Sequence, residues 1–327
     1  MRRLIFSVFW LLPALLISTG AAAQSARDWL ERMSTASQTL NYSGIFVYQH
    51  QGQLEAMQIV HAMDESGERE RLVSLTGPER EVLRDNRAVT CILGDRQSVL
   101  VNKSQPRAPF PLSFPRQLME LEQHYTFDVL DEDRVAGLNC RVVAVQPRDQ
   151  FRYGRRLCVH DASHLLLRSE VTGTDGRTVE QMMFTSVEFP EKILASALSP
   201  QLDGADFTWQ REPEQQPQID ASKRGESRWQ ISEVPDGFML VDHTWHRLSG
   251  GEPGVEHWVY SDGLASLSVY VEESQNADEA YGGVTRRGAL NAYGKMIEGY
   301  YVTVIGEVPR RTVELVGKSV ESRQAAQ

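Results

Sequence analysis

The densest group of reactive side chains is the stretch CVHDASH, which contains Cys158, His160, Asp161 and His164. Thiolates, imidazoles and carboxylates are the ligands that zinc takes in proteins, and a zinc site would need these side chains on one side of a strand end. His-Asp-Ala-Ser is also an ordinary turn sequence, since Asp and Ser bond to nearby backbone groups in turns. Because Cys158 has a better use in a disulfide, we predict that this stretch binds no metal.

The chain has three cysteines, Cys91, Cys140 and Cys158. Two β-like runs flank the turn-like PRDQ, and a hairpin centred on Asp149 would place position 140 opposite position 158. Directly opposed residues of an antiparallel pair have the Cα separation that a disulfide accepts. We therefore predict a Cys140–Cys158 disulfide, with two free buried thiols as the alternative, and we expect Cys91 to belong to the core.

Motifs for nucleophilic, metal-dependent or nucleotide-dependent catalysis are absent from the sequence. It contains no G-x-S-x-G, no H-E-x-x-H, no P-loop and no G-x-G-x-x-G. The histidines of DHTWH, His243 and His246, follow the alternation of a strand, and the acids Glu120 and Glu122 fit exposed charge. We predict that the protein is not an enzyme and needs no cofactor.

Aromatic side chains point to binding instead. Tyr42, Phe46 and Tyr48 lie on one face of the strand-like stretch YSGIFVYQH. A curved sheet lined by aromatic residues and methionines can enclose an apolar ligand. A plain packed core produces the same pattern, so both interpretations stay open. As a hypothesis, we assign these three residues to a lipid cavity.

The stretch PRAPFPLSFPRQL, residues 106–118, interrupts the pattern of strands. Its prolines remove backbone donors and restrict the residues before them, so neither a strand nor a helix can run through it. Phe110, Leu112 and Phe114 alternate along the stretch and can turn to the same side. We predict that they form a lid over the apolar interior, with a simple packed loop as the alternative.

One amphipathic helix and a long series of strands must position these residues. In SARDWLERMSTASQTL, Trp29, Leu30 and Met33 lie near one face at helical spacing, and Ser25 can cap the helix. The pattern then has period two as far as TVEQMMFTSVEF, with turns between the strands. An antiparallel sheet of so many strands must curl, and we predict a half-open barrel.

Composition divides the chain into segments. The start, MRRLIFSVFWLLPALLISTGAAAQ, combines a basic region, an apolar stretch and an Ala-x-Ala cleavage signal, so we predict that residues 1–23 are a secretory signal peptide. Residues 24–199 would form the first domain, and residues 200–227, rich in Gln, Glu, Pro and Asp, a linker. Residues 228–321 would form a smaller α+β domain with hairpins and a final helix, and residues 322–327 a frayed tail.

The chain is acidic, with a formal net charge of −10. Binding to nucleic acid needs a basic surface that neutralises phosphates. An acidic chain is also not attracted to anionic membranes by charge alone. We therefore predict no nucleic-acid partner. Export makes a disulfide permissible.

Three stretches resemble the RseB/MucB family, periplasmic negative regulators of the envelope-stress sigma factor (sigma-E or AlgU). They are DWLERMSTASQTLNYSGIFVYQHQGQLEAMQIVH, DRVAGLNCRVVAVQPRDQFRYGRRLCVHDASHLLLRSEV and WQISEVPDGFMLVDH. With the matching order of domains, the resemblance covers essentially the whole mature chain. It implies a first domain of the lipoprotein-carrier (LolA/LolB-like) type, an unclosed antiparallel β-barrel with helices in its mouth, followed by a smaller C-terminal α+β domain.

The resemblance also implies a function in the periplasm. Such proteins bind the periplasmic domain of a membrane anti-sigma factor of the RseA/MucA type and protect it from regulated proteolysis, which restrains the sigma factor. Lipopolysaccharide or lipoprotein acyl chains are expected to relieve this restraint. A periplasmic lipid or lipoprotein carrier is the alternative, and an exported hydrolase is the least favoured. The residues that contact the partner, and whether the protein is a homo-oligomer, stay open.

Overall fold

The computed structural model describes residues 25–103, 118–202, 204–211, 227–246, 254–274 and 282–323. The predicted signal peptide lies outside the described residues, and so do the lid residues Phe110, Leu112 and Phe114.

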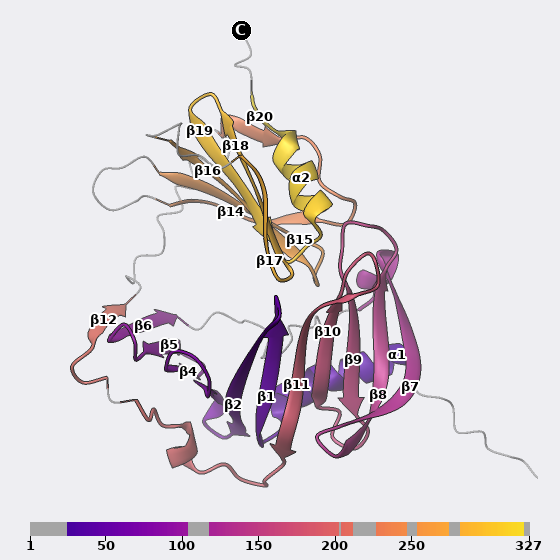
Figure 1. Cartoon of the computed structure of the whole chain (residues 1–327), viewed down its shortest axis with the longest axis vertical. Helices are drawn as coiled ribbons and strands as arrows, with labels where there is room; N and C mark the ends of the chain where they lie inside the picture. The colour runs from indigo at the N-terminus through magenta and orange to yellow at the C-terminus, as the bar shows by residue number, and fades with distance from the viewer. Residues whose placement is uncertain are drawn as a thin grey trace, which may run out of the picture.

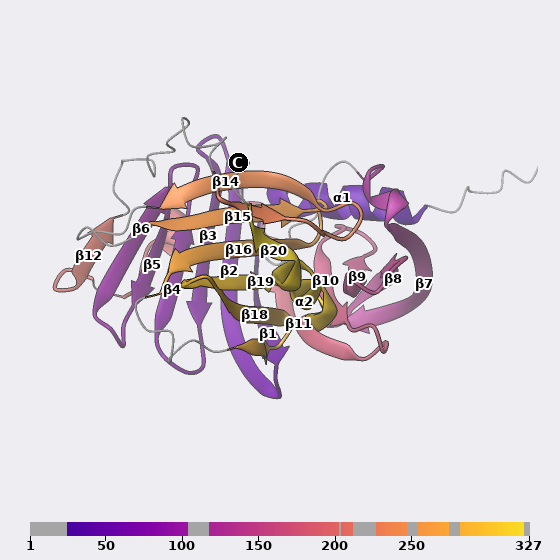
Figure 2. The same ribbon diagram turned by 90° about the horizontal axis from the view of Figure 1, so that it is seen from above.

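Twelve strands form one large sheet in the first part of the chain (Figure 1, Figure 2). The strands are β1 (Tyr42–His50), β2 (Gln53–Asp64), β3 (Gly67–Ser74), β4 (Arg80–Arg84), β5 (Ala88–Leu93), β6 (Ser98–Lys103), β7 (Tyr125–Val135), β8 (Leu138–Pro147), β9 (Gly154–His160), β10 (Leu166–Thr172), β11 (Thr178–Glu188) and β12 (Thr208–Arg211). Their order across the sheet is β12-β6-β5-β4-β3-β2-β1-β11-β10-β9-β8-β7. All neighbours pair antiparallel except β12 and β6. The edge strands β12 and β7 do not pair with each other, so the predicted unclosed sheet is confirmed.

Tight two-residue turns set the register of two of its hairpins. β1 and β2 meet at Gln51 and Gly52, with φ of 50° and 75°, and β7 and β8 meet at Ala136 and Gly137, with φ of 51° and 81°. Two successive residues at positive φ form the turns whose twist matches that of the flanking strands. Glycine takes this conformation at little cost, which explains its place in both turns.

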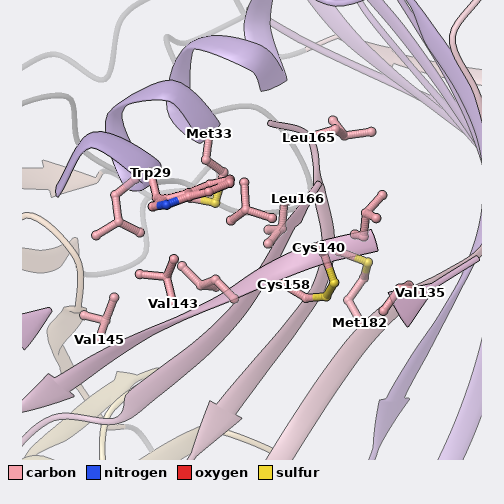
Figure 3. Close-up of a cluster of buried hydrophobic side chains, with 14 of the residues drawn as sticks. Trp29, Met33, Val135, Cys140, Val143, Val145, Cys158, Leu165, Leu166 and Met182 are labelled. Atoms are coloured by element: carbon pink, nitrogen blue, oxygen red, sulfur yellow. A yellow bond between two sulfur atoms is a disulfide. The ribbon is translucent and has the colours of Figure 1, made fainter. Parts of the chain in front are cut away.

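Helix α1 (Ala26–Thr39) packs against β2, β7 and β8. It begins with a capping box, in which Ser25 and Asp28 each accept from the other's backbone N–H. Trp29, Leu30 and Met33, which the sequence places on one face, are buried in the core. Figure 3 shows Trp29 and Met33 between the helix and the sheet. Burying each of these side chains stabilises the fold by about 2 kcal/mol. The short 3-10 helix η1 (Leu121–Gln123) precedes β7 and adds Leu121 to the same core.

A disulfide joins Cys140 of β8 to Cys158 of β9, with the two Cα atoms 5.5 Å apart. Figure 3 shows it among the buried side chains of the core. The predicted register is nevertheless wrong, because Cys140 pairs with His160, and Cys158 pairs with Val142. The two cysteines are therefore diagonal neighbours on one face of the hairpin. Cys91, on β5, has a free thiol and is only partly buried.

A second sheet forms the smaller C-terminal domain. Its strands are β14 (Met239–His246), β15 (Val255–Ser261), β16 (Ser266–Glu273), β17 (Gly283–Arg287), β18 (Leu290–Ile297) and β19 (Tyr300–Gly306), in the order β14-β15-β16-β19-β18-β17. Helix α2 (Arg310–Ser319) packs against β18 and β19, and the short strands β13 (Trp229–Ile231) and β20 (Val320–Ser322) pair beside it. Val313 and Val316 of α2 and Val320 of β20 are buried in this core. The predicted α+β class of the domain is confirmed.

The chain that follows β11 is held against the outside of the large sheet. The short 3-10 helix η2 (Ala195–Leu198) lies beside β2 and β3. The buried carboxylate of Glu81 forms an ion pair with Arg71 and accepts hydrogen bonds from the backbone N–H groups of Gln201 and Leu202. β12 then pairs with β6. The first part of the predicted linker is therefore fixed in place and extends the sheet.

Candidate functional site: a cleft between the two domains

The aromatic residues predicted to bind lipid occupy two different environments. Tyr42 and Phe46 are fully buried in the packed core, where Tyr42 stacks on His61 and Phe46 meets Phe184 edge to face. Side chains of α1 fill the concave side of the sheet against the same core. Tyr42 and Phe46 thus contribute to packing, and their predicted part in lipid binding stays a prediction. Tyr48, further along β1, lines an open cleft.

This cleft lies between the concave face of the large sheet and the ends of the strands of the C-terminal domain, and its volume is about 970 Å³. The large sheet contributes its floor, which includes Tyr48, Glu70, Leu72, Arg84, Arg155 and Glu180. The C-terminal domain contributes its roof, which includes Ser261, Leu264, Leu267, Leu290, Ile305 and Glu307. Charged, hydroxyl and aliphatic groups occur on both walls. Such a surface suits a ligand that offers both polar and apolar groups, as an extended peptide does.

Glu180 links the two walls of the cleft. One of its carboxylate oxygens accepts a hydrogen bond from the Tyr48 hydroxyl at 2.5 Å, and the other accepts from the backbone N–H of Ala289 at 2.6 Å. Burial, and the hydrogen bond to Glu180, raise the pKa of Tyr48, so the phenol keeps its proton and remains a donor. A single carboxylate therefore joins β11 to the C-terminal domain.

Charged groups on the floor are desolvated. Arg84 forms ion pairs with Glu68 and Glu70 at 3.2 and 3.3 Å. Burial raises the pKa of Glu70, and the positive charge of Arg84 opposes this effect. Burial likewise lowers the pKa of Arg155, while Glu307, 3.9 Å away in the roof, opposes it. The floor thus holds fixed charges with little solvent around them, which strengthens their interaction with any bound polar group.

A cluster around Arg152 lies next to the cleft, since Asp262 is flanked by the lining residues Ser261 and Gly263. The Arg152 guanidinium donates to Asp262 of the C-terminal domain at 2.5 Å and to the backbone carbonyl of Asp236 at 2.5 Å, and it also pairs with Asp149. Tyr125 donates to the same Asp262 oxygen at 2.9 Å. The side chains of Arg152 and Asp262 are both 0% exposed. This cluster, with the Phe238 ring 4.7 Å from the guanidinium, fixes the two domains together.

Sequence reasoning did not find this cluster. Asp262 lies in the turn-like Ser261-Asp262-Gly263, and Arg152 lies in the strand-like run FRYGRRLCVH, so the sequence gives each residue only a local role. The two residues are 110 positions apart, and no spacing within one sequence connects them. The strand-like run begins earlier than the strand itself, because β9 starts at Gly154 and leaves Arg152 in the loop before it.

The stretch CVHDASH is structural. Cys158 is in the disulfide, His160 receives a hydrogen bond from Ser163 at its Nδ1 atom, and the His164 ring lies against Trp29. Burial lowers the pKa of both histidines, so they remain neutral at pH 7. In DHTWH, His243 contacts Glu256 at 2.8 Å and stacks on Trp258. No group of three or more candidate ligands for a metal occurs among the residues that the structure describes.

Models of known families match the chain in two blocks. The model of the MucB/RseB N-terminal domain matches residues 25–202, and that of the MucB/RseB C-terminal domain matches residues 223–321. The chain belongs to the MucB/RseB family. The sigma factor AlgU regulatory protein MucB of Pseudomonas aeruginosa is 31% identical to it over 98% of both chains. The sigma-E factor regulatory protein RseB of Escherichia coli K12 is 24% identical, also over 98% of both.

Solved MucB structures share the fold of this MucB/RseB protein. MucB in complex with MucA(peri) is 27% identical and superposes with a TM-score of 0.70, covering 92% of this chain and 100% of that one. A further crystal structure of MucB, again 27% identical, gives a TM-score of 0.59 over 91% of this chain and 98% of that one. No helix among the described residues is long and apolar enough to cross a membrane.

Proposed function

We propose that this MucB/RseB protein binds the periplasmic domain of a membrane anti-sigma factor and protects it from proteolysis, thereby restraining an envelope-stress sigma factor. The observation that carries the proposal is the match to MucB in its complex with MucA(peri), which extends over 92% of this chain. The two-domain order of the family is kept along the whole match. A regulator of this kind acts by binding, which agrees with the absence of catalytic motifs from the sequence.

The cleft between the domains is the surface that we assign to the partner. It is long, open and mixed in polarity, and it offers hydrogen-bonding groups such as Glu180, Glu307 and Ser268 beside apolar ones. A segment of the anti-sigma factor that is disordered alone would become ordered in the cleft. A protease needs an extended, accessible segment, so a segment held in the cleft would be protected.

The periplasm is the location that we propose for this regulator. The basic start, apolar stretch and Ala-x-Ala site of residues 1–23 support export. The disulfide between Cys140 and Cys158 supports an oxidising compartment. We also propose that lipopolysaccharide or lipoprotein acyl chains relieve the restraint on the sigma factor, and that Phe110, Leu112 and Phe114 form a lid over the apolar interior.

A binding experiment with the mature chain tests the proposal. The mature protein should form a complex with the periplasmic domain of the cognate anti-sigma factor, measured by isothermal titration calorimetry, and should slow its cleavage by the site-specific protease. Absence of a complex at micromolar concentrations would contradict the proposal. Substituting Leu290 of the roof, which is 36% exposed, with Ser should weaken binding, whereas Leu54→Ser, at an exposed position outside the cleft, is the matched control.

A further inference from the structure

The two domains have separate hydrophobic cores. One core lies between α1 and the large sheet, and the other lies between α2 and the smaller sheet. Among the described residues, the apolar side chain of the C-terminal domain that packs on the first core is Leu264. Within the described part of the chain, no continuous apolar interface therefore holds the domains together. Domains joined in this way are expected to move relative to each other unless something else fixes them.

Polar contacts fix them, and several of these come from one loop. Others come from Tyr125 of β7, Arg155 of β9 and Glu180 of β11. Residues 149–153, between β8 and β9, reach into the C-terminal domain. Arg152 contacts Asp262, the carbonyl of Phe151 accepts from the Thr312 hydroxyl at 2.7 Å, and the Tyr153 hydroxyl accepts from the Asn291 amide at 2.9 Å. Gln150 also accepts from Arg311. The loop 149–153 thus makes several polar contacts with the C-terminal domain.

The Arg152–Asp262 pair is the buried centre of this joint. Neither side chain is exposed to solvent. Arg152 of the first domain neutralises the Asp262 carboxylate, and Arg152 also pairs with Asp149 of its own loop. The desolvation of two such charges roughly offsets their attraction, so a buried pair adds little net stability. Breaking one side leaves a buried charge without a partner, which is costly. When the domains separate, both charges return to water.

A buried ion pair of this kind fixes the relative orientation of the two domains but adds little net free energy to their association. The hydrogen bonds of Arg152 are satisfied in one orientation of the domains, whereas apolar contacts tolerate many. The cleft depends on this orientation, because its floor and roof belong to different domains. The Glu180 contact with Ala289 also exists only when the walls face each other.

We propose that the Arg152–Asp262 pair, with the loop 149–153, is a clasp whose closure creates the interdomain cleft and whose opening abolishes it without unfolding either domain. The inference that the clasp controls partner binding rests on the proposed function. Anything that binds the open arrangement better than the closed one would release the partner by mass action.

Asp262 offers a variant that separates the clasp from the local turn. Its Oδ1 atom accepts from the backbone N–H groups of Leu264 and Ala265, while its Oδ2 atom faces Arg152 and Tyr125. Asp262→Asn keeps an oxygen for the turn and removes the negative charge. Arg152→Met removes the positive charge from the other domain. Arg141→Ala is the matched control, because Arg141 lies on β8 of the same hairpin and its ion pair among the described residues is with the exposed Glu132.

Small-angle scattering and amide hydrogen exchange on the mature full-length chain test the clasp. In Asp262→Asn and Arg152→Met, the radius of gyration should increase, and the Ala289 amide should exchange at least tenfold faster. The Leu264 and Ala265 amides should stay protected, which reports that the turn is intact. Arg141→Ala should match the wild type in every measurement. Arg152→Met leaves the turn untouched. If this variant keeps the wild-type radius of gyration and the wild-type exchange rate of the Ala289 amide, the clasp proposal is overturned.

Titration with the periplasmic domain of the anti-sigma factor separates the two proposals. Opened variants should bind at least tenfold more weakly than the wild type. Variants that open and still bind like the wild type would overturn the link between clasp and partner. If the wild type itself does not bind, the proposed function fails, while scattering and exchange still decide the clasp.

Discussion

Asp262 shows how one carboxylate serves two levels of structure. Its Oδ1 atom closes the turn between β15 and β16 through Leu264 and Ala265, and its Oδ2 atom receives Arg152 and Tyr125 from the other domain. The first function is local and can be predicted from Ser-Asp-Gly in the sequence. The second depends on a residue 110 positions away and becomes visible only in the folded chain.

At Phe46, the expected effect of a mutation is loss of packing. This side chain is 0% exposed and lies against Phe184 in the first core. Phe46→Ala should lower the free energy of unfolding by about 3–5 kcal/mol, because transfer and cavity terms add. Urea denaturation followed by circular dichroism measures this change. A loss below about 1 kcal/mol would indicate that Phe46 lines an open cavity, as the lipid-cavity hypothesis holds.

At Glu68, the expected effect depends on pH. The hydrogen bond from buried His61, with help from Arg84, lowers the pKa of Glu68 below its ordinary value of 4.5. A carboxylate with a lowered folded-state pKa stabilises the protein above the unfolded value and loses this contribution as pH falls through the folded value. Glu68→Gln should therefore destabilise the protein at pH 7 and have progressively less effect below pH 4.5. Thermal unfolding across this range measures it, and an effect independent of pH would contradict the charge-based explanation.

Among the elements, the β8–β9 hairpin shows where sequence prediction succeeds and where it fails. The two strands, the intervening turn and the cysteine pair follow from alternation and spacing. The register does not, because Cys140 pairs with His160 and not with Cys158. The loop also contacts the C-terminal domain at Phe151, Arg152 and Tyr153, and local spacing does not reveal these contacts.

The disulfide of this hairpin should stabilise the first domain. It closes a loop with a sequence separation of 18, for which chain entropy in the unfolded state predicts about 3 kcal/mol. Replacing both Cys140 and Cys158 with Ala should lower the unfolding free energy by about this amount, plus a small packing loss. Denaturation with and without reductant measures it, and Cys91→Ser is the control, since its thiol is free. Equal stability of oxidised and reduced wild type would contradict the prediction.

The curved sheet itself was predictable from the sequence, but the candidate site was not. Alternating strands and glycine turns such as Gly52 and Gly137 are local signals. Tyr42, Phe46 and Tyr48 share a strand, but the first two are buried in the core and the third lines the cleft. The difference arises because α1 covers one part of the sheet and the C-terminal domain faces another.

For the whole molecule, two separate cores predict two separable folding units. Chains limited to residues 24–202 and 227–327 should each show cooperative thermal unfolding, because each retains its core. Neither alone should bind the anti-sigma factor as tightly as the full chain, since each carries one wall of the cleft. Calorimetry and titration of the two pieces measure both effects. An N-terminal piece that binds like the full chain would place the partner site elsewhere.

The anchoring of Gln201 and Leu202 by Glu81, and of β12 by β6, has a kinetic consequence. Residues 212–226 connect Arg211 to Ser227, and an extended chain spans at most roughly 3.5 Å for each residue. A tether this short keeps the two domains at a local concentration on the order of millimolar. Reclosing is then a first-order process, whose rate does not change with the amount of protein in the cell. If the clasp opens as proposed, the two domains of one chain would therefore reclose without an encounter between separate molecules.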